Sequence, residues 1–254
     1  MMVLVPAAAA LSVVMIAAWW WQRRVANGGW VDAFWTFGLG GVGAMVALIA
    51  GHGARSWLVA LLIGAWALRL GMYIAARTRS GPEDTRYAQF RVDWGASFQV
   101  RMFWFLQIQA AAAAMLLVPV YLAAVSPRPL GWVDGVAVAV AVVAVLGEAL
   151  ADRQMHAFRR DHHGKVCDAG LWGLCRHPNY FFEWLYWVTY PLLAAGAPWG
   201  WLALIGPAAM YWLLVHVSGI PPLEAQMLRR RGDAYRDYQR RVRAFVPIPK
   251  GKSA

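Results

Sequence analysis

Long apolar runs, separated by short polar segments, dominate the 254-residue chain. Seven of these runs are long enough to cross about 30 Å of hydrocarbon as helices. They cover Val3–Trp21, Trp30–Ala50, Trp57–Ala76, Met102–Val125, Trp132–Ala151, Tyr180–Ala195 and Trp199–Val217. The pattern predicts an all-α protein, a polytopic membrane helix bundle with about seven transmembrane helices. Arg23 and Arg24 follow the first run and no basic residue precedes it, which is the reverse of signal-peptide order, so we expect this run to be retained.

The distribution of the 24 lysines and arginines predicts how the bundle is oriented. Nearly all of them fall in the first, third and fifth loops and in the C-terminal tail. The opposite loops contain only Arg55 and Arg128. Because cytoplasmic loops of membrane proteins are enriched in basic residues, the N-terminus is expected outside and the C-terminus in the cytoplasm.

Composition supports the membrane assignment and narrows the function. Of the residues, 60% are hydrophobic and 15% are charged, and the mean hydropathy is +0.44. The net charge of +11 comes without any nucleic-acid-binding motif, so we attribute it to basic cytoplasmic loops and expect no nucleic-acid partner. Cys167 and Cys175 lie in one polar loop and indicate no disulfide framework. The tail from Glu224 to Arg243 has apolar residues spaced among its charges and predicts an amphipathic helix packed along the membrane surface or against the loops.

Ionisable residues inside the predicted spans are candidates for function, because a charge is costly there, and we single out Asp32, Arg69, Glu148 and Glu183. Each alone could pair structurally with a neighbouring helix. Four in one bundle favour a polar, functional cavity.

The densest polar segment surrounds the fifth loop. Glu148 and Asp152 share one helix face, and Arg159 and Lys165 follow them. Next comes Arg176-His-Pro-Asn-Tyr-x-x-Glu183, whose proline suits the first turn of a helix. Cations for phosphates and acids for hydroxyls suit a charged nucleotide cofactor. The histidines and cysteines of this loop match no zinc-ligand spacing, so no metal site is predicted, and a passive basic connector is the simpler alternative.

These residues resemble those of a known family. Gly170-Leu-Trp and Arg176-His-Pro-Asn-Tyr-x-x-Glu183 look like the cofactor segment of the steroid 5α-reductase-like membrane reductases, and closest to their bacterial branch, DUF1295. Other marks of that branch occur along the chain: Val31-Asp-x-Phe-Trp35, Leu68-Arg-Leu-Gly71, Gly81-x-Glu-Asp-x-Arg-Tyr87, Ser218-Gly-Ile-Pro-x-Leu-Glu224 and Gly232-Asp-x-Tyr-x-x-Tyr238. Isoprenylcysteine carboxyl methyltransferases carry a distant relative of the Arg-His-Pro segment.

The resemblance implies an enzyme of the bacterial inner membrane that uses NADPH to reduce a carbon–carbon double bond conjugated to a carbonyl, in a lipophilic, steroid-like substrate. It implies one domain over residues 1–254, with substrate-side helices in 1–125 and the cofactor-binding part in 126–254. The implied cofactor-binding residues are Glu148, Asp152, Arg159, Lys165, Arg176, His177, Asn179, Tyr180, Glu183, Tyr235 and Tyr238.

The resemblance also implies an acid and a tyrosine on early spans that polarise the substrate carbonyl. Asp32 stands in for the acid. Tyr73 lies one turn from the expected tyrosine, and Arg69 lies nearer that position. We therefore expect Asp32, with Tyr73 or Arg69, to hydrogen-bond the carbonyl oxygen as charge develops there.

Two other functions fit the sequence. An S-adenosylmethionine-dependent methyltransferase of a lipid or prenyl-cysteine would share the topology and much of the fifth loop. A non-catalytic membrane scaffold or lipid-binding protein would share the basic inner face and would bind no nucleotide. The substrate and the oligomeric state are not readable from the residues.

Overall fold

The computed structural model describes residues 2–162 and 164–248, which form helices joined by short loops. Six helical stretches of this part are long and apolar enough to cross a membrane: Leu4–Val25, Trp30–Ala50, Gly53–Ser80, Thr85–Ala124, Trp132–Asp161 and Gly200–Arg231. The prediction of an all-α polytopic bundle is confirmed. The remaining predicted span, Tyr180–Ala195, corresponds to the 16-residue helix α8 (Pro178–Leu193), which is about 24 Å long. The count of seven and the orientation stay predictions.

The chain divides into two compact units, and each is described by itself. Unit 1 contains Met1–Asp134 and Tyr190–Gly206. Unit 2 contains Gly135–Thr189 and Pro207–Ala254.

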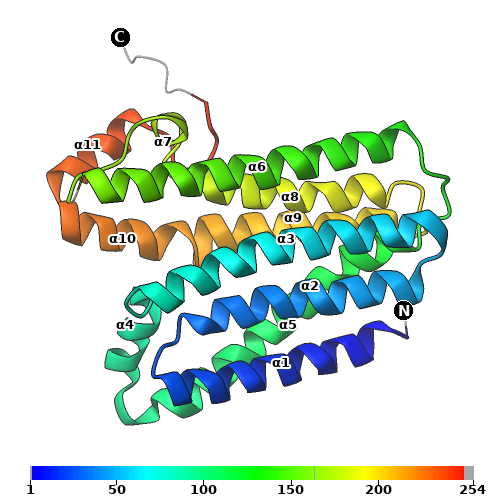
Figure 1. Cartoon of the computed structure of the whole chain (residues 1–254), viewed down its shortest axis with the longest axis horizontal. Helices are drawn as coiled ribbons and strands as arrows, with labels where there is room; N and C mark the ends of the chain where they lie inside the picture. The colour runs from blue at the N-terminus through cyan, green and yellow to red at the C-terminus, as the bar shows by residue number, and fades with distance from the viewer. Residues whose placement is uncertain (1, 163, 249–254) are drawn as a thin grey trace. The chain divides into compact units, whose positions relative to one another are not determined.

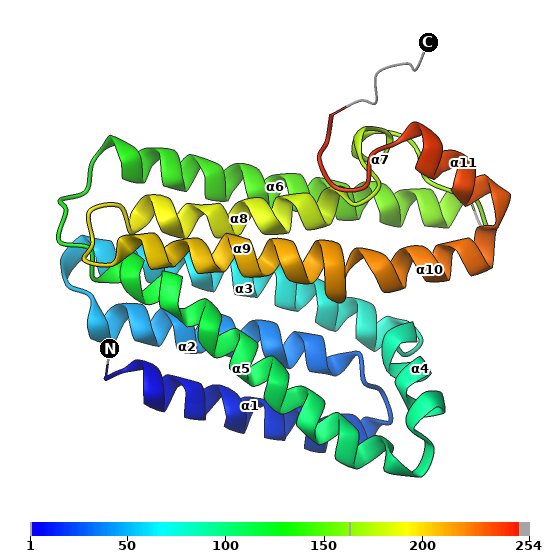
Figure 2. The same cartoon turned by 180° about the vertical axis from the view of Figure 1, so that it is seen from behind.

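Unit 1 is built on α1 (Leu4–Val25), α2 (Trp30–Ala50), α3 (Gly53–Ser80), α4 (Thr85–Trp94) and α5 (Phe98–Ala124). Helices α1, α2 and α3 lie side by side, and α5 crosses α1 and α2 (Figures 1 and 2). Small residues permit this packing, because a Cβ atom on Gly40 of α2 would lie 2.0 Å from the Cβ of Ala67 of α3. Close backbone approach at glycine and alanine is typical of membrane helix pairs.

Unit 2 contains most of α6 (Trp132–Asp161), of α8 and of α9 (Ile205–Trp212), together with a π-helical segment (Leu213–Val217) and α10 (Ile220–Arg231). Two short helices, α7 (Leu171–Leu174) and α11 (Asp233–Arg241), lie together at one end of this unit (Figures 1 and 2). A Cβ on Gly147 of α6 would lie 2.4 Å from the ring of Phe182 of α8, so glycine lets this aromatic ring pack directly on α6.

The amphipathic tail differs from the prediction of one helix. It forms two helices, because Gly232 adopts a φ of 52° between α10 and α11. A positive φ is accessible to glycine at little cost and ends α10 there.

Candidate functional site

The C-terminal half of α6 presents two neighbouring faces. One face contacts other parts of unit 2. The carbonyl of Ala151 accepts a hydrogen bond from Trp172 Nε1 at 3.0 Å, and Gln154 Oε1 accepts one from Leu171 N at 3.0 Å. Glu148 and Asp152 lie about 100° around the helix from Gly147 and Ala151. Both acids are buried, as expected for a polar site in an apolar bundle.

The segment from Arg176 to Glu183 carries the next group of predicted residues. His177 directly precedes α8, and its ring stacks on Tyr180 with 5.5 Å between ring centroids. Asn179 and Glu183 lie one turn apart on α8. Glu183 is buried and accepts a hydrogen bond from Trp187 Nε1 at 3.1 Å. The sequence spacing therefore does bring Asn179 and Glu183 to one helix face.

A carboxylate from α10 holds this segment in place. Glu224 Oε1 accepts from Arg176 Nε at 2.7 Å and lies 3.0 Å from His177 Nε2, while Oε2 accepts from Gln239 Nε2 at 2.7 Å. We call Glu224, Arg176, His177 and Gln239 the Glu224 cluster. It joins three segments of unit 2 that are far apart in sequence.

The tail reinforces the same junction through its main chain. Arg176 N donates to the carbonyl of Arg243 at 2.8 Å, and His177 N donates to that of Ala244 at 3.1 Å. Tyr238 of α11 donates its hydroxyl to the carbonyl of Trp172. Hydrogen bonds with the C-terminal tail thus hold both Gly170-Leu-Trp and Arg176-His-Pro in place.

Burial sets the protonation of several groups here. It lowers the pKa of His177, an effect that hydrogen bonding to Glu224 only partly offsets. Burial also raises the pKa of Cys175 to about 11, so this thiol is a poor nucleophile. The pKa values of Tyr235 and Tyr238 are raised, mainly by burial, and both phenols stay neutral at physiological pH.

The two predicted phosphate-binding cations lie at the surface of unit 2. Arg159 is in the last turn of α6, Lys165 is in the loop that follows, and both side chains are exposed. Together with the buried acids and the Glu224 cluster, every predicted cofactor-binding residue belongs to unit 2. This unit therefore contains acceptors for hydroxyl groups and cations for phosphates.

Unit 1 carries a second polar group around Asp32, in the first turn of α2. Its carboxylate accepts from Arg86 Nη2 at 2.5 Å and from the Tyr87 hydroxyl at 2.7 Å. Asp84 caps α4 and also accepts from Arg86 Nε at 3.0 Å. Although burial raises the pKa of Asp84, the charge and hydrogen bonds of Arg86 lower it overall. We call Asp32, Asp84, Arg86 and Tyr87 the Asp32 cluster.

The other two predicted catalytic residues lie along α3. This helix runs antiparallel to α2, and two close approaches set the register: Gly29 with Thr78 and Gly40 with Ala67. In this register Asp32 lies level with Ala75, whereas Tyr73 is about 3 Å and Arg69 about 9 Å further along the helix axis. The Arg69 guanidinium lies over the Tyr73 ring, 5.7 Å from its centroid.

Sequence reasoning assigned no role to Arg86, Tyr87 or Glu224. All three stand inside quoted motifs, and that was the available signal. Their roles depend on which distant residue each one meets, and spacing along the chain does not reveal this.

A third cluster lies at the other end of unit 1 and looks structural. Asp134 accepts from Arg55 Nη1 at 2.9 Å and from Arg128 Nη1 and Nη2 at 2.9 Å each. We call Asp134, Arg55 and Arg128 the Asp134 cluster. It pairs the two basic residues predicted to lie in the loops opposite to the cytoplasmic side of the membrane.

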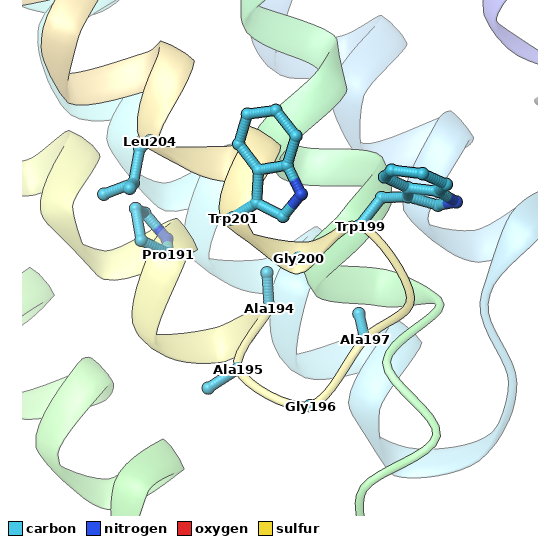
Figure 3. Close-up of a pocket in the computed structure, with 9 residues that line it drawn as sticks. All are labelled: Pro191, Ala194, Ala195, Gly196, Ala197, Trp199, Gly200, Trp201 and Leu204. Carbon is cyan, nitrogen blue, oxygen red and sulfur yellow. The ribbon is translucent and has the colours of Figure 1, made fainter.

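Two open pockets occur in unit 1, and their linings contain none of the predicted site residues. One, of about 350 Å³, lies in the turn between α8 and α9, where Trp199 and Trp201 extend from the loop (Figure 3). These side chains are 68% and 65% exposed, as expected for tryptophans at a membrane interface. The other, of about 360 Å³, is apolar and lies between α1 and α2, lined in part by Val14, Trp30 and Phe37.

Comparisons with known proteins identify the family. No curated protein and no solved structure matches the chain. The family described as "Protein of unknown function (DUF1295)" matches residues 18–242, which is most of the chain. The protein therefore belongs to the DUF1295 family.

Proposed function

We propose that this DUF1295 protein is an NADPH-dependent reductase of a carbon–carbon double bond conjugated to a carbonyl, acting on a lipophilic, steroid-like substrate. The observation that carries the proposal is the set of hydrogen bonds that holds the start of the segment Arg176–Glu183. It is held by Glu224 and the tail, in the same unit as the buried acids of α6. A passive connector has no need of such a junction, nor of buried carboxylates.

The donor and acceptor set suits this cofactor. Asp152 and Glu148 offer acceptors to ribose hydroxyls, and the exposed Arg159 and Lys165 offer cations to phosphates. Asn179 and Glu183, one turn apart on α8, would hold the carboxamide of the nicotinamide. The Nδ1 atom of His177 is buried without a hydrogen-bond partner among the described residues, which is consistent with a ligand at this point.

When bound, NADPH would supply the hydride that adds to the β-carbon of the double bond. The protein must then stabilise negative charge on the carbonyl oxygen and deliver a proton to the α-carbon. A neutral hydroxyl suits the first task. Tyr87 is such a hydroxyl, and it is buried, so its hydrogen bond would form away from bulk water. It donates its one hydrogen to Asp32 at 2.7 Å, so that hydrogen would have to turn from Asp32 to the carbonyl oxygen of the substrate. Asp32, which accepts from Arg86 and Tyr87, would position Tyr87, and a direct hydrogen bond from Asp32 to the carbonyl oxygen stays a prediction, as do the roles of Tyr73 and Arg69.

Turnover in lipid nanodiscs tests the proposal. Protein mixed with NADPH and a 3-oxo-Δ4 steroid should oxidise NADPH, and Glu183→Gln and Asn179→Ala should each lower kcat/KM about a hundredfold. Asp233→Asn, at a side chain that is 97% exposed, is the matched control and should have no effect. Full turnover by the two site variants would contradict the assigned site.

A parallel thermal-shift titration separates the alternatives, because a true ligand stabilises the folded state by mass action. Stabilisation by S-adenosylmethionine and not by NADPH would favour the methyltransferase. Stabilisation by neither would favour a scaffold or lipid-binding protein.

A further inference from the structure

The Glu224 cluster fixes where His177 carries its proton. His177 Nε2 lies 3.0 Å from Glu224 Oε1, and the same oxygen accepts from Arg176 Nε at 2.7 Å. A carboxylate paired with a guanidinium can only accept hydrogen bonds, so Nε2 must be the nitrogen that bears hydrogen.

The remaining ring nitrogen is then an acceptor. The His177 side chain is 2% exposed, and the Arg176 cation beside it disfavours a second positive charge, so the ring is neutral and Nδ1 carries a lone pair. Nδ1 is buried and has no hydrogen-bond partner among residues 2–162 and 164–248. A buried acceptor without a donor is unfavourable, and in native proteins it usually marks a water or a ligand.

We propose that Nδ1 of His177 accepts a hydrogen bond from an O–H or N–H group of the bound cofactor, and that Glu224 is the positioning residue that fixes the required tautomer. The inference rests on the proposed function. It also restricts the site. A phosphate oxygen cannot face Nδ1, because both atoms would be acceptors, so His177 meets a ribose hydroxyl or the carboxamide and leaves the phosphates to Arg159 and Lys165.

Two substitutions test the roles of the two ring nitrogens of His177 separately. The amide of His177→Gln can still donate from the Nε2 position to Glu224 but has no acceptor at the Nδ1 position. The amide of His177→Asn keeps an acceptor near Nδ1 but loses the bond to Glu224. We expect His177→Gln to weaken NADPH binding about tenfold with a nearly unchanged Tm. His177→Asn should lower Tm and weaken binding by only about threefold.

Glu224→Ala tests the positioning role. It removes the acceptor that holds hydrogen on Nε2 and so permits a proton on Nδ1. Nitrogen-15 NMR of protein labelled in the histidine rings should report a neutral Nε2–H tautomer for His177 in the wild type. In Glu224→Ala the Nδ1–H tautomer should appear, accompanied by weaker NADPH binding. A purely structural Glu224 would change Tm without changing the tautomer.

The outcomes separate the two levels of the account. A proton on Nδ1 in the ligand-free wild type overturns the inference, as does wild-type NADPH affinity in His177→Gln, which would mean that water occupies this position. If wild-type protein does not bind NADPH, the proposed function fails and the cofactor contact falls with it, whereas the tautomer is still measured independently.

Discussion

The Asp134 cluster and the Glu224 cluster are built alike and differ in completeness. In each, one carboxylate accepts hydrogen bonds from an arginine and from further donors, and each cluster includes at least one buried side chain. Around Asp134 the pairing is closed: Arg55 also donates to the carbonyls of Leu193 and Arg128, at 3.0 and 2.9 Å. Around Glu224 one acceptor, Nδ1 of His177, is left over.

This difference teaches how to separate a structural ion pair from a site in a membrane bundle. Burial and charge pairing occur in both clusters and therefore do not discriminate. The atom left without a partner does, because folding alone gives no reason to bury it. We therefore infer a structural role for the Asp134 cluster and propose that the Glu224 cluster contributes to ligand binding.

Disrupting the Asp134 cluster should have the largest of the predicted effects, a loss of unfolding free energy. Asp134→Ala leaves Arg55, whose side chain is 5% exposed, as a buried cation without its counterion. The expected loss is about 3–5 kcal/mol of unfolding free energy, measured by chemical denaturation in detergent. Affinity for NADPH in the fraction that still folds should be unchanged. A variant as stable as the wild type would contradict the structural assignment.

The Asp32 cluster extends the comparison to the proposed chemistry. Tyr87→Phe removes the hydroxyl that meets Asp32 and should lower kcat about a hundredfold with little change in NADPH affinity. Tyr73→Phe is the matched control and should have a smaller effect, because Tyr73 stacks with Arg69. The reverse ranking in single-turnover kinetics would favour Tyr73 over Tyr87 as the hydroxyl that serves the reaction.

Removing the shared acceptor of the Glu224 cluster should weaken the attachment of the C-terminal tail to the rest of unit 2. Glu224→Ala takes the acceptor from Arg176, His177 and Gln239. Because these groups are only partly exposed, we expect a loss of about 2 kcal/mol and faster tryptic cleavage near Arg241. Asp237→Asn, which disturbs only exposed pairs of α11, controls for the loss of charge. Equal cleavage rates in both variants would contradict the role of Glu224 in holding the C-terminal tail in place.

The smallest effect concerns pH. Burial lowers the pKa of His177 in the folded state, against the attraction of Glu224 and with the repulsion of Arg176. The unfolded state therefore binds this proton more readily. The contribution of neutral His177 to the free energy of unfolding is complete above the unfolded pKa of about 6.5. It is lost as pH falls toward the pKa of the folded state, by at most about 1.4 kcal/mol per pH unit. The difference between wild type and His177→Gln, followed by thermal unfolding from pH 7.5 to 5, should have this sign. A pH-independent difference would contradict it.

Hydropathy alone predicted the class of fold, because a run of apolar residues long enough to span lipid leaves the backbone few alternatives to a helix. It failed where a single residue redirects the chain. Gly232 divides the predicted tail helix into α10 and α11.

The candidate site could be predicted only in part. Residues one turn apart, such as Asn179 and Glu183, follow from helical periodicity. The meeting of Asp32 with Tyr87, 55 positions away, depends on how α4 folds back onto α2, and no periodicity encodes that. The same holds for Glu224 and His177, which are 47 positions apart.

Hydrogen–deuterium exchange in nanodiscs tests the central claim, a nucleotide site in unit 2, most directly. Wild-type protein with NADPH should exchange more slowly in residues 165–177 and 233–244, and Glu183→Gln should show no such protection. Exchange that NADPH leaves unchanged, or that only S-adenosylmethionine slows, would contradict the account.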